Sequence, residues 1–588
     1  MIERAPVVPD ALLYATRPGR IERANGGRWR WVDGADGVAR ELEDDVVRVA
    51  AACDRFAPLA DHADRVRLAL GLSADAAGER VRAWLECGVG IEARAWLAGA
   101  AQSGPGPLPD PLLVVRAYER PQGLRRLLDS LAADARRHGA RHRCLVVDDT
   151  TDPAAAQRTI AVLAACAAQA TAELRLLGPA QRGAAIEWLL DAVPTAAHEA
   201  LRPMLDPDHP SAHTGSRTWN WAVLAAAGTS LSILDDDVLF PLRHAPEAGS
   251  TLQVWDSNEP DTRFYDEPEG WRAEAALDED PYRWLGRWLG CSAGRLMSSA
   301  GFDPALLQGR RPAELAALRD STVAAAVPGL YGGIAYDNSA YLAYSNRWSQ
   351  ASLWQDPFRR GRLEGDNLWH GYRAPRLVSY ATYTPLLLDA RELLPFAGTW
   401  GRVDDTYFLM LLRAIAGPLW FVHLPVALGH VDLAPRQRLA QALAPLRIDT
   451  NAFMADLFLR WSADAVEGSR GDRLQAIGAR CAALATEPDR VLAARVCEFR
   501  DGLRGRLVGH LDAALQRHPS ADPAWREIAG GIAAANRGSA APGIDALALA
   551  QHRAALDQVA AVAPCWPALW ARMRDGRDAF EGFLDRIH

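Results

Sequence analysis

The arrangement of apolar and polar residues divides the chain into three parts. From about Pro111 to about Asp432, short apolar runs alternate with segments of helical period, which is typical of an α/β sheet domain. Leu112–Pro121 (LLVVRAYERP) reads as a buried strand, and a helix with one leucine-rich face follows it. Polar residues at the end of this strand are therefore expected at the carboxyl edge of the sheet, where open α/β sheets bind ligands.

A proline- and glycine-rich segment, Ser103–Pro111, separates the first hundred residues from this part. The preceding pattern predicts one strand at Arg28–Val32 and three helices at 40–54, 60–71 and 75–88. We expect a small winged-helix-like α+β module over residues 1–103. It weakly resembles the peptide-recognition domains of peptide-modifying enzymes, although a structural cap is the favoured interpretation.

The third part begins at about Pro435, where the sequence becomes rich in alanine and leucine at helical spacing. Prolines and glycines interrupt this pattern, so that about six helices are expected. The predicted division is therefore a capping module (1–103), an α/β domain (104–434) and an all-α domain (435–588). Within the middle part, residues 176–214 read as an insertion.

Composition excludes several classes of protein. The 588-residue chain contains 65 basic residues, and all of them are arginine, which excludes a P-loop lysine or a Schiff-base lysine. A net charge of −8 with interspersed charges gives no basic face for nucleic acid. Eight scattered cysteines without a CxxC pair favour a reducing cytoplasm, and apolar runs too short to cross a bilayer predict no membrane span.

Three consecutive carboxylates provide the strongest chemical signal. A helix and a glycine lead into a short strand, Ser230–Leu234, which ends in Asp235, Asp236 and Asp237. Three acids at the end of a buried strand repel one another unless a positive group lies beside them. Mg²⁺ or Mn²⁺ with a diphosphate would supply it, since these cations prefer oxygen ligands; the alternative is a solvated acidic turn. Asp149 follows another strand in the same way.

A second acidic pair, Asp404–Asp405, precedes a helix and follows a segment, Trp400–Val403, expected to be extended. Aspartates at this position also cap helices, so a purely structural role is the alternative. In the apolar run that follows, His430 is a candidate metal ligand, whereas His423 is expected in the core. One competing pattern, GCSAG at Gly290–Gly294, lacks the preceding strand of a serine-hydrolase elbow, and that class is disfavoured.

Together, VVRAYERP, VVDDTTD, GSRTWNWAVLAAAGTSLSILDDD and GRVDDTYF resemble the GT-A glycosyltransferases, especially the inverting family-2-like group. The resemblance covers roughly 111–432. It implies a Rossmann-type GT-A sheet, an Asp-x-Asp metal motif, and a general base at the second residue of a later acidic pair. The family has glutamate where this chain has Asp404.

The resemblance implies roles for individual residues. The catalytic pair would be Asp405, as general base, and Asp404. Metal would be held by Asp237, Asp235 and His430. The nucleotide sugar would be contacted by Arg116, Arg120, Asp149, Arg217, Asn220, Asp235 and Asp236.

The implied activity is metal-dependent transfer of a sugar from a nucleotide sugar to an acceptor hydroxyl, with inversion. The cofactor would be Mn²⁺ or Mg²⁺, and the acceptor a glycan, a lipid-linked molecule or a peptide. The alternative is a non-catalytic GT-A-like module that binds a glycan, nucleotide or peptide.

Overall fold

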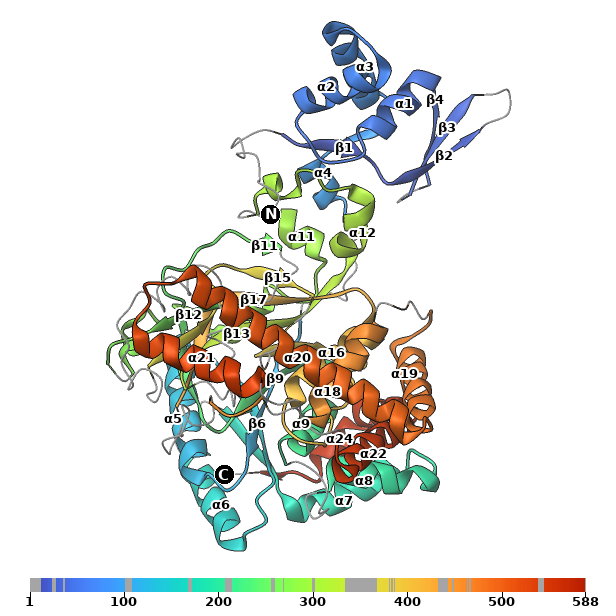
Figure 1. The fold of residues 1–588 in the computed structure, drawn as a ribbon. Helices are drawn as coiled ribbons and strands as arrows, with labels where there is room; N and C mark the ends of the chain where they lie inside the picture. Colours follow the sequence, from blue (N-terminus) through green and yellow to red (C-terminus); the bar gives the residue numbers. More distant parts are fainter. Residues whose placement is uncertain are drawn as a thin grey trace.

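The structure is a computed structural model (Figure 1). It describes residues 12–23, 28–34, 37–100, 108–167, 172–206, 214–254, 260–267, 269–298, 302–333, 367–379, 381, 384, 386–431, 443–446, 449–462, 464, 467–537 and 544–586. Both α-helices and a large mixed sheet are present, which confirms the expected α/β class.

A parallel set of strands forms one half of the main sheet. Strand β6 (Leu112–Ala117) lies between β7 (His142–Asp148) and β9 (Thr229–Asp235), and both neighbours run parallel to it. Strand β8 (Ala172–Leu177) extends the set beyond β7. Strand β6 and the second half of β7 are buried on both faces and read in the sequence as apolar runs. Strand β8 instead alternates apolar residues with Glu173 and Arg175, and β9 includes the buried Ser230 and Ser232.

The other half of the sheet is mixed. Beyond β9, the order continues through β16 (Leu387–Ala390) and β13 (Thr322–Gly332) to β17 (Leu419–His430). Strand β16 runs antiparallel to both neighbours, whereas β13 and β17 are parallel. Strand β10 (Val238–His244) follows β9 in the chain and pairs antiparallel with β17. This return brings the end of β9 next to the end of β17.

Smaller strands complete the sheet. They are β11 (Gln253–Val254), β12 (Asp261–Phe264), β14 (Leu368–Gly371), β15 (Arg376–Val378) and β18 (Asp585–Arg586). Strand β18 lies near the end of the chain and pairs antiparallel with β8, so the last residues close one edge of the sheet.

Helices cover the sheet on both faces. In chain order they are α5 (Pro121–His138), α6 (Pro153–Ala167), α7 (Pro179–Leu190), α8 (His198–Leu205), α9 (Thr214–Ala225), α10 (Pro281–Gly286), α11 (Ala293–Ser298), α12 (Pro312–Asp320) and α16 (Asp404–Ala416), with short 3₁₀ turns at η1 (Thr195–Ala197), η2 (Gly270–Ala273) and η3 (Pro304–Leu307). Helix α10 precedes the GCSAG segment, and no strand leads into Ser292. The segment therefore lacks the strand that a serine-hydrolase elbow requires, as expected from the sequence.

The N-terminal residues form a separate lobe at the top of Figure 1. It contains β1 (Tyr14–Thr16), β2 (Gly19–Arg23), β3 (Trp29–Asp33), β4 (Ala39–Leu42), α1 (Asp44–Ala52), α2 (Leu59–Leu70), α3 (Ala74–Glu86), β5 (Gly90–Glu92) and α4 (Ala93–Ala98). The predicted strand and three helices are present, but the first helix was placed too early because residues 39–42 pair with β3. The sequence interpretation also missed the other strands of this lobe and α4.

This lobe shares part of a hydrophobic core with the α/β part, because Trp96 and Leu97 belong to the same buried cluster as Leu296. Phe56 exchanges backbone hydrogen bonds with Gly309 and Arg310. Trp96 lies under the guanidinium of Arg319, whose carbon is 4.9 Å from the ring centroid.

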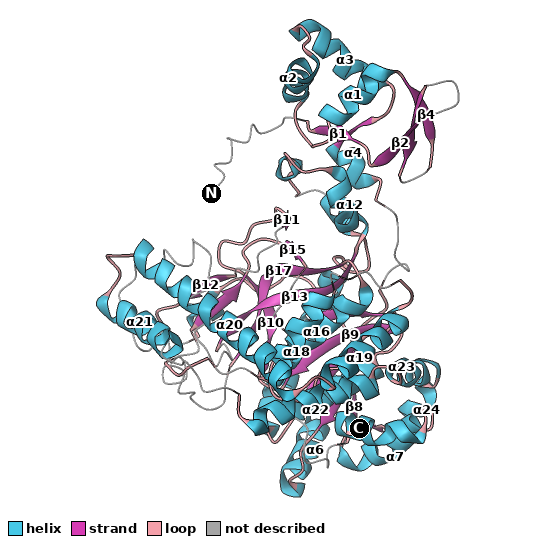
Figure 2. Ribbon diagram, turned by 45° about the vertical axis from the view of Figure 1, so that its right-hand side comes forward, coloured by secondary structure: helices cyan, strands magenta, loops and turns pink. Residues whose placement is uncertain are grey.

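The C-terminal helices are α18 (Thr450–Trp461), α19 (Arg470–Ala485), α20 (Asp489–Arg517), α21 (Pro523–Arg537), α22 (Ala546–Val562), α23 (Trp566–Asp575) and α24 (Arg577–Glu581). Most of them share one hydrophobic core with the sheet, and α18 and α19 pack on α16 (Figure 2). Trp566, for example, is fully buried and donates from Nε1 to the carbonyl of Leu394 at 2.9 Å. The change in sequence pattern near 435 therefore does not separate two hydrophobic cores. No helix in the described segments is long and apolar enough to cross a bilayer.

Candidate active site at the carboxyl edge of the sheet

The candidate site lies where the order of the parallel strands reverses. The chain passes from β6 to β7 on one side, and later returns to place β9 on the other side of β6. Such a reversal leaves a crevice at the carboxyl ends of the two central strands. Arg116 and Asp235 are register partners at the ends of β6 and β9, so the predicted motifs meet there.

Arg116 joins two of the acidic motifs. It donates from Nε to Oδ1 of Asp235 at 2.8 Å and from a terminal nitrogen to Oδ2 of Asp404 at 3.1 Å. The same nitrogen donates to the carbonyl of Gly215 at 3.0 Å, and the guanidinium lies 5.0 Å from the ring centroid of Trp219. The side chain is only 12% exposed. Burial opposes the charge of Arg116, but the two carboxylates outweigh that effect and raise its pKa.

Arg120 is the positive neighbour of the remaining two acids. Its Nη1 lies 3.1 Å from Oδ2 of Asp237 and 3.4 Å from Oδ1 of Asp236. Its own side chain is half exposed, whereas both aspartates are buried. The protein thus supplies arginine charges beside all three strand-end carboxylates.

Asp237 also faces His430 across the β10–β17 pairing. Oδ1 of Asp237 lies 3.4 Å from Nε2 of His430, and the two residues come from segments almost 200 positions apart. On the other side of β17, Gly332 allows β13 to lie against the His430 backbone: its φ is +99°, and a Cβ there would lie 2.3 Å from the carbonyl oxygen of His430. His423 of the same strand is buried against Tyr372, with its pKa lowered by burial to about 3, as expected of a core residue.

Asp237 and His430 are suited to act together as ligands of a divalent cation, since a carboxylate and an imidazole both serve Mn²⁺. Asp235 lies on the same edge of the sheet, although Arg116 occupies its Oδ1. Within the described ranges, no group of three or more His, Cys, Asp or Glu side chains is arranged to hold a metal ion. Further ligands would have to come from water and from a bound diphosphate, as is common for Mg²⁺ sites.

Asp404 and Asp405 are the first residues of α16. The turn before them is not extended as the sequence suggested: Gly401 has φ +108° and Val403 has φ +66°. A β-branched residue in the left-handed region is strained, and such strain accumulates at functional sites. The turn directs Asp404 to Arg116, while Oδ1 of Asp405 accepts the backbone N–H of Thr406 at 2.7 Å.

Two carboxyls of the site have pKa values near neutrality. Burial, with a further contribution from Asp237, raises the pKa of Asp236 to about 7. Burial and the neighbouring Asp404 raise the pKa of Asp405 to about 7 as well. The pKa of Asp235 is also raised by burial, although Arg116 opposes this. A carboxyl with a pKa near 7 can accept a proton at neutral pH more effectively than an ordinary aspartate.

Asp149 lies in a buried cluster near the carboxyl end of β6. One of its oxygens accepts from Arg182, and the other accepts from Nε and Nη2 of Arg217 at 3.1 and 2.8 Å. All three side chains are buried, so this carboxylate offers no exposed surface to a nucleoside base in this conformation. The backbone N–H of Asp149 donates to the carbonyl of Ala117, the last residue of β6, so the cluster adjoins the end of that strand.

Arg182 was missed by the sequence interpretation because it lies on α7, within the segment read as an insertion. Pro179 indicates the start of this helix, but nothing in the local sequence indicates that Arg182 pairs with Asp149. Asn220, by contrast, was expected near the nucleotide. It is fully buried, accepts the N–H of Ala397 at 2.7 Å and donates to the carbonyl of Met204 at 3.2 Å. These contacts tie α9 to two backbone segments.

The structure therefore brings most of the predicted site together. The residues that meet at the carboxyl edge are Arg116, Arg120, Asp235, Asp236, Asp237, Asp404, Asp405 and His430. Comparisons of the chain with protein-family models, with curated proteins and with solved structures find no match.

Proposed function

We propose that this protein is a glycosyltransferase of the GT-A type that uses a nucleotide-sugar donor. The observation that carries the proposal is the convergence of Arg116, Asp235 and Asp404, which come from three motifs separated by more than a hundred residues each. Their meeting point is the carboxyl edge of the sheet, where open α/β sheets bind nucleotides, and this supports the resemblance stated from the sequence.

Asp405 is the proposed general base. Its neighbour Asp404 accepts a hydrogen bond from Arg116 at 3.1 Å. The raised pKa of Asp405, about 7, suits this carboxylate to take a proton from an acceptor hydroxyl near neutral pH. Deprotonation of the hydroxyl and its attack on the anomeric carbon, with departure of the nucleoside diphosphate, would invert the configuration.

Asp237 and His430 are the proposed metal ligands, with Asp235 beside them. A bound Mn²⁺ or Mg²⁺ would neutralise charge that develops on the diphosphate leaving group. The half-exposed Arg120 can contribute to the same task, because its guanidinium already lies at the mouth of the acidic cluster. The eight cysteines are all free thiols, which favours a cytoplasmic protein. The acceptor would be a glycan, a lipid-linked molecule or a peptide.

The test is release of nucleoside diphosphate from a panel of nucleotide sugars with Mn²⁺ or Mg²⁺. Asp405→Asn should lower turnover by about 10² to 10⁴ and leave diphosphate binding intact. Asp237→Asn should abolish the dependence of binding on the cation. Asp557→Asn, at an exposed position of α22, is the matched control and should behave as wild type. Donor hydrolysis that needs no cation, or full activity in both site variants, would contradict the proposal.

A non-catalytic binding module is the second candidate. It is favoured by the arginines beside Asp235, Asp236 and Asp237, since the protein already supplies positive charge to these acids. Such a module would bind a nucleotide or glycan and release no diphosphate from any donor in the panel.

A further inference from the structure

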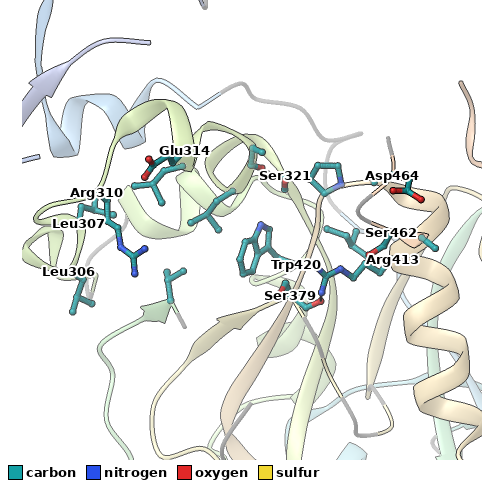
Figure 3. A pocket seen from close by; sticks show the side chains of 18 of the residues that line it. Leu306, Leu307, Arg310, Glu314, Ser321, Ser379, Arg413, Trp420, Ser462 and Asp464 are labelled. Carbon is teal, nitrogen blue, oxygen red and sulfur yellow. Dashed lines mark hydrogen bonds between the residues drawn. The ribbon is translucent and has the colours of Figure 1, made fainter. Parts of the chain in front are cut away.

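A cavity of about 600 Å³ lies at the edge of the sheet opposite to the candidate site (Figure 3). Leu419, the first residue of β17, is part of its wall, whereas His430, the last residue of the same strand, belongs to the candidate site. A strand of this length spans roughly 35 Å. The cavity is therefore separate from the proposed nucleotide site, and its volume is that of a small-molecule pocket.

One end of the cavity is lined mainly by apolar side chains, with Arg310 and Glu314 beside them. Phe302, Leu307 and Leu315 line it from the η3–α12 region, together with the partly exposed Leu306. Trp420 stands between this end and the other one (Figure 3). These side chains offer a surface against which an aliphatic or aromatic body could be buried, at a gain of roughly 25 cal/mol per Å² of apolar area.

The other end carries positive charge. Arg413 and Arg473 line it from α16 and α19, whereas Arg310 lies at the leucine-lined end, beside Leu306 and Leu307 (Figure 3). Arg413 donates to the carbonyl of Ser379 at 2.5 Å, and within the described parts of the chain it contacts no carboxylate. Burial lowers the pKa of Arg413, which shows that its charge is held at a cost.

The acids in the wall have arginine partners of their own. Asp464 pairs with Arg480 at 2.7 Å, and Glu314 lies 3.8 Å from Arg311. They therefore do little to neutralise Arg413. Arg473 donates to the carbonyl of Ile415 at 3.3 Å, near the end of α16, and so offsets the negative end of that helix dipole. Among the described residues, the cavity wall therefore has an uncompensated positive charge at Arg413, which an anionic ligand would neutralise.

We propose that this cavity binds an anionic amphiphile, with a carboxylate or phosphate group at Arg413 and Arg473 and an apolar body against the leucines and Phe302. Arginine suits either head group because its planar fork binds both. The site is independent of the glycosyltransferase proposal, since none of its residues belongs to the candidate active site.

The experiment compares four ligands of one chain length by isothermal titration calorimetry on the full chain, below their micellar concentrations. The probes are decanoate, decyl phosphate, decanol and decyltrimethylammonium. We expect one molecule of an anionic probe per chain, with decanol and the cation binding at least about tenfold more weakly. The stronger of the two anions identifies the head group. Equal binding of decanol would reduce the cavity to an apolar cleft and overturn the proposal.

Variants then locate the site. Arg413→Gln should weaken decanoate or decyl phosphate about tenfold, and Arg473→Gln about threefold because its guanidinium also donates to the carbonyl of Ile415. Leu306→Asp should repel the apolar body. Arg490→Gln, an exposed change on α20, is the control and should bind as wild type. If Arg413→Gln fails to fold by circular dichroism, the other two variants decide; wild-type affinity in both would overturn the proposal.

Discussion

Replacement of Arg116 by glutamine tests whether this arginine holds the acidic motifs together. The change keeps a polar side chain but removes the charge between Asp235 and Asp404. The partly exposed Asp235 and the more buried Asp404 would then lie close together without a cation between them. We expect Arg116→Gln to be among the most destabilising single changes in the α/β part of the chain.

The magnitude follows from burial and geometry. Removing one partner of a buried ion pair costs about 3–5 kcal/mol, because the remaining charge is left uncompensated. Loss of the cation–π contact with Trp219 adds about 0.5–1 kcal/mol. The unfolding entropy of a unit with several hundred residues is on the order of 1 kcal/mol/K. The melting temperature should therefore fall by about 3–6 °C at neutral pH.

The pH dependence gives the sharper test. Burial already raises the pKa of Asp235, and without Arg116 it should rise further. A group whose folded pKa is raised stabilises the fold below its unfolded pKa and loses that contribution as pH rises through the folded pKa. The deficit of Arg116→Gln relative to wild type should therefore shrink as pH falls from about 8 to 5, when its carboxyls protonate.

The assay is differential scanning fluorimetry across that pH range, with Arg125→Gln as control. Arg125 makes an exposed pair with Asp129 on α5, and its loss should cost less than about 0.5 kcal/mol at every pH. The double variant Arg116→Gln, Asp404→Asn should recover part of the loss, since it leaves one buried charge fewer. A deficit below about 1 kcal/mol, or one that does not change with pH, would refute the reasoning.

Three further predictions concern single residues. Val403→Gly should leave stability unchanged or raise it by up to about 1 kcal/mol, because it relieves a left-handed β-branched residue; a larger loss in a denaturant titration would contradict the strain. Asn220→Ala should lower the free energy of unfolding by about 1–3 kcal/mol because it leaves the Ala397 N–H unpaired. Calorimetry should show an unchanged affinity for nucleoside diphosphate. Weaker binding without a loss of stability would instead indicate that Asn220 contacts the nucleotide. Burial opposes ionisation of Asp280, but contacts with His142 and a backbone N–H outweigh the effect of burial and lower the pKa of Asp280 below 3.8. The ionised Asp280 therefore stabilises the fold above its unfolded pKa, and this stabilisation is lost as pH falls through its folded pKa. Wild type should lose stability more steeply than Asp280→Asn below about pH 4, and parallel denaturation curves would contradict this.

Local sequence determined the elements that carry the candidate site. Leu112–Ala117 forms a strand because most of its side chains are apolar on both faces, and Asp404–Ala416 forms a helix because its apolar residues recur at helical spacing. In Thr229–Asp235 the apolar signal is shorter and comes from Leu231, Ile233 and Leu234. Since polar residues follow these strands directly, their position at the carboxyl edge of the sheet could be inferred before the fold was known.

Tertiary structure decided which charges meet. The partners of Arg116 are 119 and 288 residues away, and the pairing of Asp149 with Arg182 depends on where α7 packs. Sequence spacing does not encode such distances, because side chains from different elements are brought together only by strand order and helix packing. The left-handed turn at Val403 is also a product of that packing, since its own residue type disfavours the conformation.

The same reason explains the C-terminal region. Its helices were evident from local periodicity, but their apolar faces do not specify a partner, because hydrophobic burial is proportional to area and has no direction. In the folded chain most of those faces pack on α9, α16 and the sheet instead of forming a core of their own. Local sequence thus determined what each segment is, whereas the choice of neighbour required the whole fold.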